Sequence, residues 1–176
     1  MHKIDTKNWR WFSLDDLFVI TWSTTTPKNS LELADDKPYP YVTTAATNNG
    51  IFWYSEKYTE DWNVLTVDSA VIWYCSYQEK NFTASDHVEK LIPKFKMTKR
   101  IALFLVSLIN QMWEILWYAY NEKRSQTALK KESIKLPVNW NWNPDWEYIE
   151  NYMKTLEDKC ETRLKNLNFA RGGGDK

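Results

Sequence analysis

The hydrophobic and polar positions follow two different periods along this chain. From residue 9 to about residue 91, short aromatic and β-branched runs alternate with polar clusters, which is typical of strands separated by turns. These runs are 39–43, 51–54, 63–67 and 71–75. A helical turn is expected within residues 12–20, around Leu14, Leu17 and Phe18, and a polar loop over residues 22–29.

The period changes after Thr98, which is a suitable N-cap for a helix. Apolar residues then recur at spacings of three and four up to Leu116, which predicts an amphipathic helix. They are Ile101, Phe104, Leu105, Leu108, Ile109, Met112 and Leu116. Residues 118–124 interrupt this pattern, and a short helix is expected over residues 125–132, ahead of the segment 134–137.

A second long helix is predicted near the C-terminus, with Asn143 as N-cap and Pro144 at its first position. Its apolar stripe is narrow, as in a coiled-coil seam, and Arg163 fills the one missed position. The stripe consists of Trp146, Ile149, Met153, Leu156, Cys160 and Leu167. A helix over 144–167 would be about 36 Å long, so we expect a second helix to pack against it; the alternative is that it folds back on its own domain.

These patterns predict an α/β (α+β) fold, in which a mixed or antiparallel sheet packs against helices and a long coiled-coil-type helix follows. We divide the chain into a globular domain (1–142), the long helix (143–168) and a disordered tail (169–176). At least eight of the eleven tryptophans are expected to pack in the core, because most of them fall at core spacing.

Glycine is scarce. Three of the four glycines lie at 172–174, and only Gly50 remains in the body of the chain, in an Asn48-Asn49-Gly50 sequence that predicts a turn. The chain therefore cannot form a Gly-rich phosphate loop, which excludes a Rossmann dinucleotide site, a P-loop and the usual S-adenosylmethionine domain. No cofactor is expected to bind this chain.

Two cysteines are too few for a disulfide framework or a structural zinc site. The first residues lack the apolar stretch of a signal peptide, so we expect a cytoplasmic protein. The longest apolar run, 101–109, is about half of what a membrane-spanning helix needs, so no membrane role is expected.

The net charge is zero but unevenly distributed. Residues 1–93 carry 8 basic and 13 acidic groups, residues 94–135 carry 9 and 3, and residues 136–176 carry 6 and 7. A local basic block of this kind fits contact with phosphates, whereas solvated helix faces are the simpler interpretation.

Candidate catalytic motifs fail on geometry. The sequence 143–146 resembles part of an amino-methyltransferase motif but lacks its second proline and a cofactor loop. Asp145 and Glu157 have a nuclease-like spacing, yet on one helix they would lie about 18 Å apart and could not share a metal ion. Ser85, Asp86 and His87 are sequential neighbours that point apart, so they form no triad. The sequence predicts a protein that is not an enzyme and has no metal site.

Several segments, taken in order, resemble one known family. They are 9–18, 39–43 with 48–51, 82–88 with Leu91, 101–105, 134–138 and 144–152. Their order and spacing resemble the target-recognition domain of DNA specificity (S) subunits of type I restriction–modification enzymes, and the related subunits of type IIB and IIG systems. The chain departs from that pattern at Trp22-Ser23 and at 68–70, where the family usually has glycine.

This resemblance implies a non-catalytic reader of double-stranded DNA that corresponds to half of an S subunit. It implies methyltransferase (M) subunits as partners, with the restriction (R) subunit as a further one, and S-adenosylmethionine bound by the methyltransferase. We expect a homodimer through the C-terminal helix.

Loop position and composition nominate the DNA contacts. Thr43, Thr44, Asn48 and Asn49 are assigned to bases or grooves, and Lys28, Tyr120, Lys123 and Arg124 to the backbone or grooves. The competing hypothesis is a protein-interaction module that docks on restriction–modification subunits and regulates their assembly without reading DNA. A Trp-rich sugar-binding module is a third option, and it would require exposed aromatic platforms.

Overall fold

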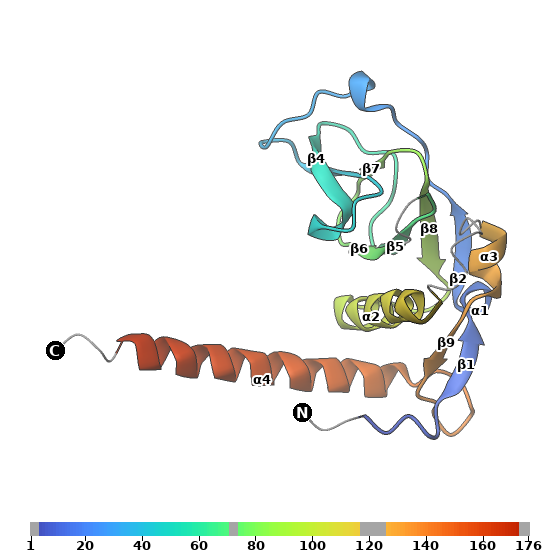
Figure 1. The fold of residues 1–176 in the computed structure, drawn as a ribbon, viewed down its shortest axis with the longest axis vertical. Coiled ribbons are helices and arrows are strands. Elements are labelled where there is room, and N and C mark those ends of the chain that lie inside the picture. The colour runs from blue at the N-terminus through green and yellow to red at the C-terminus, as the bar shows by residue number, and fades with distance from the viewer. Residues whose placement is uncertain (1–3, 71–73, 117–125, 173–176) are drawn as a thin grey trace.

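The computed structural model describes residues 4–70, 74–116 and 126–172. It has the expected mixed α/β architecture, but the strands form three small sheets instead of one (Figure 1). The four-stranded sheet is antiparallel, in the order β2 (Phe18–Trp22), β8 (Val88–Pro93), β5 (Val64–Asp68) and β6 (Cys75–Gln78). This sheet supports the other layers.

Two smaller sheets lie on either side of it in space (Figure 1). A three-stranded sheet joins β4 (Ile51–Ser55), β3 (Tyr39–Val42) and β7 (Thr83–Ala84), and β3 pairs with β7 in parallel. We call this sheet with the loops 24–38 and 43–50 the outer lobe. A two-stranded ribbon pairs β1 (Arg10–Ser13) with β9 (Ser133–Leu136), which closes the chain ends onto the domain.

The helices follow the predicted periodicity closely. Helix α2 spans Lys99–Leu116, and the Thr98 hydroxyl accepts a hydrogen bond from the backbone N–H of Ile101 at 3.3 Å, as expected of an N-cap. The expected turn near Leu14 is α1 (Leu14–Leu17), and the short helix before β9 is α3 (Gln126–Lys131). Local patterning therefore predicted where these helices lie.

Helix α2 packs on one face of the four-stranded sheet and forms the main core with it. Leu65 and Leu91 of the sheet and Leu105 and Ile109 of α2 have no exposed surface. Asn110 on α2 also bonds both backbone groups of Cys75, accepting from its N–H at 2.7 Å and donating to its carbonyl at 3.0 Å. Because β6 is an edge strand, Asn110 takes the place of a missing strand partner.

Helix α4 spans Trp146–Gly172. It begins two residues later than the predicted helix, which had Pro144 at its first position. The expectation that Asn143 is the N-cap is wrong. Pro144 pairs with Val138 in an isolated β-bridge, and the Asp145 carboxylate accepts from the N–H of Tyr148 at 2.9 Å. The tight turn over 138–144 therefore includes Pro144, and Asp145 is the N-cap.

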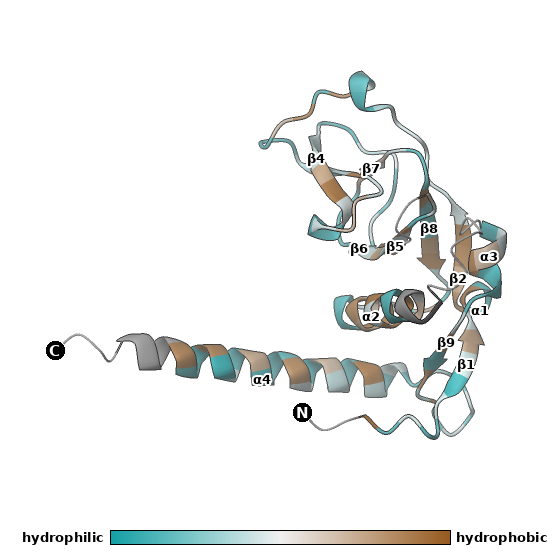
Figure 2. Ribbon diagram, in the orientation of Figure 1, coloured by the Kyte–Doolittle hydropathy of each residue, from teal (hydrophilic) through white to brown (hydrophobic). Residues whose placement is uncertain are grey.

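The apolar stripe of α4 has two different environments. Ile149 is fully buried and Trp146 and Met153 pack against the core, so the first half folds back on its own domain. Leu164 and Leu167 are 59% and 62% exposed. Figure 1 shows the second half extending away from the domain, and Figure 2 shows apolar bands recurring along it. The first half therefore folds back on its own domain, and packing of a second helix against the exposed half stays a prediction.

Most described tryptophans do not pack in the core, contrary to expectation. Six are exposed by 40% or more, namely Trp11, Trp22, Trp53, Trp62, Trp140 and Trp142. Trp9 and Trp146 are partly buried against the core. The alternation of residues along a strand assigns side chains to the two faces of a sheet, but it does not show which face packs against the core. The small sheets have one face open to solvent, and tryptophans on that face are exposed.

Truncating the apolar anchor of α4 tests this division of the helix. Ile149→Ala should lower the free energy of unfolding by about 2–5 kcal/mol, because it opens a cavity in a closed core. Lys165→Ala is the control on the exposed half, because this side chain lies outside the apolar stripe, and it should change stability by less than about 0.5 kcal/mol. Urea denaturation of both variants measures the difference, and equal effects would show that α4 is anchored elsewhere.

Candidate nucleic-acid interface

The Asn48–Gly50 turn (η2) is the most constrained part of the outer lobe. Its three residues all adopt positive φ, at 50°, 58° and 77°. A Cβ on Gly50 would approach the carbonyl oxygen of Thr43 to 3.2 Å, so both conformation and space require glycine there. Asn and Gly accept this left-handed backbone more readily than other residues, which explains why the predicted turn forms.

Hydrogen bonds fasten this turn to the rest of the domain. The backbone N–H and the hydroxyl of Thr43 donate to the carbonyl of Gly50, at 2.8 and 3.3 Å. The Asn49 side chain donates to the carbonyl of Tyr77 on β6, and Gln78 donates to the carbonyl of Asn49 at 3.1 Å. The turn is therefore a rigid projection of the four-stranded sheet.

The predicted base contacts divide into two kinds. Thr43 and Asn49 use their side chains for bonds within the protein, so they position the turn. Thr44 is half-buried, and Asn48 is exposed with its amide donating locally to the carbonyl of Ile51 at 3.1 Å. All four lie in the loop 43–50, and their contact with DNA stays a prediction.

The Lys28 side chain reaches β4, the strand that follows this turn, although 20 residues separate Lys28 from Asn48 in the sequence. It belongs to the 3-10 turn η1 (Lys28–Ser30), and its amine sits 3.9 Å from the ring centre of Phe52 on β4. Phe52 and Trp53 are 46% and 40% exposed. These two rings were missed from the sequence, where their strand-like run suggested packing. Tyr120, Lys123 and Arg124 lie outside the described residues.

A buried ion pair connects the outer lobe to β8. The Glu60 carboxylate is 2% exposed, and it accepts from the amine of Lys90 and, at 2.5 Å, from the backbone N–H of Thr24. Removal of one partner of such a pair would leave an uncompensated buried charge. Glu60 and Lys90 therefore fix the lobe and are not available to a ligand.

Glu89 on β8 is the one buried side chain in the described part of the chain with a polar atom, Oε1, that has no hydrogen-bond partner. Its Oε2 accepts from the amide of Gln126 at 3.1 Å. Burial raises the pKa of Glu89 above its ordinary value of 4.5, and the Gln126 and Ser69 side chains offset part of that rise. Glu89 faces the interior, so it is not a candidate ligand group.

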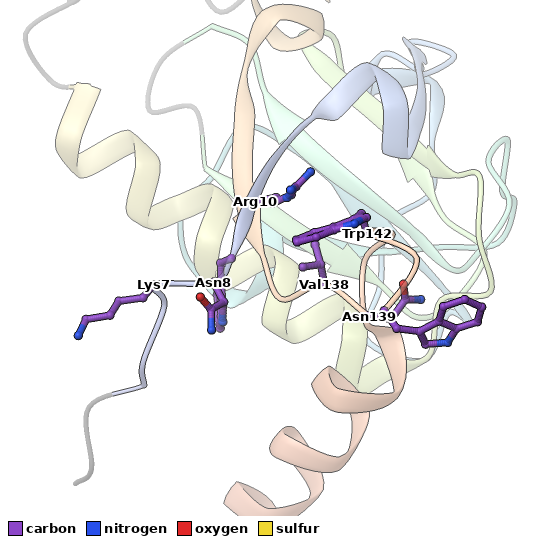
Figure 3. A pocket seen from close by; sticks show the side chains of 8 residues that line it. Lys7, Asn8, Arg10, Val138, Asn139 and Trp142 are labelled. Carbon is purple, nitrogen blue, oxygen red and sulfur yellow. The ribbon is translucent and has the colours of Figure 1, made fainter.

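A second concave surface lies at the start of α4, in a region that we call the root turn, residues 138–144. The side-chain oxygen of Asn139 accepts hydrogen bonds from the backbone N–H groups of Asn141 and Asn143, at 2.9 and 3.2 Å. This closed turn projects Trp140, which is 86% exposed. Arg10 stacks on Trp142 with its guanidinium carbon 3.6 Å from the ring centre, and Figure 3 shows Trp142 between Arg10 and Val138.

The root-turn pocket has a volume of about 520 Å³ and contains two cations, Lys7 and Arg10, but no carboxylate. Exposed indole rings beside an arginine are typical of protein contact sites as well as of nucleic-acid sites. The lysine points away from the indole of Trp142 in Figure 3, so the two cations do not converge on one point. This surface was not predicted from the sequence, because its tryptophans were expected to pack in the core.

The Ser85, Asp86 and His87 side chains are not arranged as a catalytic triad, because the Ser85 hydroxyl donates to a backbone carbonyl. His87 sits at positive φ in a turn with a side chain 54% exposed, 3.6 Å from Asp86, and the Ser85 hydroxyl donates to the carbonyl of Asp86. Within residues 4–70, 74–116 and 126–172, no group of three or more His, Cys, Asp or Glu side chains could hold a metal ion. Over the same ranges, no helix has the length and apolarity to cross a membrane.

The fold and its surfaces define a class: a small mixed α/β domain with a polar rigid turn on one side and a projecting helix on the other. The model of the type I restriction modification DNA specificity domain matches residues 6–166. The chain belongs to this family, as the resemblance predicted. A curated relative, the specificity subunit S.BcgI of a type II restriction enzyme of Heyndrickxia coagulans, is 31% identical over 162 residues, which is 89% of this chain and 46% of that protein.

Solved structures share the fold. The type I restriction–modification S subunit from M. genitalium has a TM-score of 0.66 at 18% identity, over 95% of this chain and 43% of that one. The HsdS subunit from Thermoanaerobacter tengcongensis has a TM-score of 0.61 at 11% identity, over 96% and 41%. The expected architecture with a long C-terminal helix is thereby confirmed. The chain spans less than half the length of each of these proteins.

Glu89 generates a test of pH dependence. Its raised pKa means that it contributes stability that is present below pH 4.5 and is lost as the pH rises through the folded-state pKa. Glu89→Gln removes this titration, so the variant should lose less stability than wild type between pH 5 and pH 8, as measured by thermal unfolding. Glu56→Gln is the control, because the Lys37 amine lowers the pKa of Glu56, so this variant should keep the pH profile of the wild type over that range. Parallel pH profiles of wild type and Glu89→Gln would contradict the buried state of this carboxylate.

Proposed function

We propose that this chain is a sequence-specific reader of double-stranded DNA in a restriction–modification system, and that it acts as half of a specificity subunit without catalysing a reaction. The observation that carries this proposal is the match of the DNA specificity domain to residues 6–166. The curated relative and the solved S subunit are about twice as long as this chain. A cytoplasmic location follows from this role.

The outer lobe supplies the reading surface in this proposal. The Asn48–Gly50 turn is held rigidly by Thr43 and Asn49, which lowers the entropy lost when it enters a groove. Asn48 and Thr44 then present polar groups to base edges, a contact for which the asparagine amide is suited. Lys28, beside the exposed ring of Phe52, contacts the phosphate backbone, which positions the turn without carrying sequence information.

The projecting half of α4 pairs with the same helix of a second copy. Its exposed Leu164 and Leu167 lack a cover in the single chain, and a coiled-coil stripe becomes stable only when two helices share it. Two copies would present two outer lobes to a target made of two half-sites. The methyltransferase subunits that join this assembly would bind S-adenosylmethionine and modify the base, and the restriction subunit would join through them.

The root turn favours a second role, docking on a restriction–modification subunit. Trp140 and Trp142 beside Arg10 have the composition of a binding hot spot. A chain with this role alone would bind its partner but no specific DNA sequence. Exposed tryptophans are also what a sugar-binding module would require, but the family model that matches this chain is that of a DNA specificity domain.

Selection from a random-sequence duplex library, with and without a methyltransferase partner, separates DNA reading from docking alone. We expect enrichment of a short motif. Lys28→Ala should then weaken binding several-fold, and by the same factor for the enriched duplex as for other duplexes. It should also reduce the slope of log affinity against log salt concentration by about 1. The exposed Lys154 on α4 provides the control, because Lys154→Ala should leave affinity and slope unchanged. Enrichment of no motif under either condition would refute the DNA-reading role.

Lys123→Ala/Arg124→Ala extends the same titration to the predicted contacts in the segment 117–125. The double variant should lower the salt slope by about 2 if both side chains contact phosphates. An unchanged affinity and slope would remove these residues from the interface, without bearing on the outer lobe.

Sedimentation equilibrium tests pairing through α4. Leu164→Glu/Leu167→Glu should shift the protein from the mass of two copies to one, with unchanged thermal stability of the domain, because both side chains are exposed in the single chain. Lys165→Glu lies on the same turn outside the apolar stripe and should keep the mass of the pair. A mass that is the same for the double variant and wild type would exclude this half of α4 as the pairing surface.

A further inference from the structure

Arg100 on α2 holds α4 at two points. Its Nη1 donates to Oε1 of Glu150 at 2.9 Å, and its Nε donates to Oε2 of Glu157 at 2.7 Å. The hydroxyl of Thr98 donates to the other oxygen of Glu150. Glu150 and Glu157 are seven residues apart, so they lie on one face of the helix, separated by about 10 Å along its axis. We call this group the Arg100 clamp.

The apolar contacts of α4 occur closer to its start. Trp146 stacks on Phe95 with 3.9 Å between ring centres, and Tyr152 meets Phe104 edge-on at 6.2 Å. These contacts and the buried Ile149 fall within the first two turns. Glu157 is the outermost of the α4 residues bonded to another element among those the structure describes, and residues 158–167 are exposed. The clamp is thus the last support before the helix projects.

A small change of direction at this point produces a large displacement. From Glu157 to Gly172 the helix extends about 22 Å. A tilt of about 10° there would move its end by about 4 Å, whereas successive base pairs of DNA rise by about 3.4 Å. Apolar contacts resist separation but are non-directional, whereas an arginine fork bonded to two carboxylates fixes an orientation. The clamp is therefore suited to set direction more than stability.

We propose that the Arg100 clamp fixes the angle at which α4 leaves the domain, and through it the number of base pairs between the two half-sites of the target. Arg100 is in this sense a positioning residue for specificity. It does not touch DNA, and it acts through the helix. The part of the proposal that concerns base-pair spacing rests on the proposed pairing of two DNA-reading copies.

The angle can be measured without DNA. Cys160→Ser removes the exposed thiol of the proposed pairing stripe, and Cys75 is buried. Lys165→Cys on the projecting half of α4, outside that stripe, and Lys57→Cys, two residues after β4, then provide two exposed sites for spin labels. Doubly labelled protein is diluted in unlabelled protein so that only distances within one chain are observed. Pulsed electron resonance should give a narrow distance distribution for the parent and a clearly broader or shifted one for Arg100→Ala.

Two further variants make this result specific. Lys99→Ala removes the neighbouring ion pair with Glu79, at 2.8 Å on the same turn of α2, and should keep the narrow distribution. Glu157→Gln weakens only the outer contact, so it should broaden the distribution even if Arg100→Ala proves too unstable to purify. A distribution as narrow as the parent's in both Arg100→Ala and Glu157→Gln would overturn the clamp.

The second readout uses duplexes with two copies of the enriched half-site separated by four to nine base pairs. Wild type and Lys99→Ala should bind the duplex with one particular separation about tenfold more tightly than the others. Arg100→Ala should bind duplexes of neighbouring separation with affinities within about twofold of each other. Its affinity for a single half-site should be unchanged. An unaltered spacing preference in Arg100→Ala would overturn the link to spacing. Failure of the wild type to bind a half-site would refute DNA reading instead, and the label distances would still decide whether the clamp exists.

Discussion

Helix α2 is the element on which the arrangement of this molecule depends, because it is shared by two layers. One side packs on the four-stranded sheet, where Leu105 and Ile109 are fully buried, and another meets the first half of α4. Asn110 completes the edge strand and Arg100 binds the projecting helix, so both ends of α2 contribute polar bonds to a neighbouring element. A shift of α2 would therefore disturb the sheet and the helix direction together.

This sharing separates two surfaces with different chemistry. The outer lobe extends from the sheet on the side away from α4 and carries the rigid Asn48–Gly50 turn (Figure 1). The root turn and the projecting half of α4 lie on the opposite side and carry exposed indole and leucine side chains. Polar groups on a rigid support suit recognition of base edges, and apolar groups suit contacts with protein. In the proposed function, one chain would therefore read DNA and bind partners at different places.

The features that could be predicted from the sequence are those that depend on residues close together in the chain. Helix α2 and the Asn48–Gly50 turn were found because periodicity and left-handed residues act over a few positions. The sequence did not predict which strands pair, so one sheet was expected where three exist, and tryptophans such as Trp140 were assigned to the core. The partners of Arg100 lie 50 and 57 residues away, and no local pattern indicates them. Thr43 and Asn49 could be nominated as site residues, but their role in holding the turn became visible only in the fold.

Amide hydrogen exchange with and without the enriched duplex tests most directly whether the outer lobe is the surface that reads DNA. Slower exchange is expected over residues 43–52, with little change in 146–157, where α4 is already anchored. Protection confined to 138–144 or to α4, with residues 43–52 unchanged, would contradict that claim and would place the function of this domain in its contacts with other proteins.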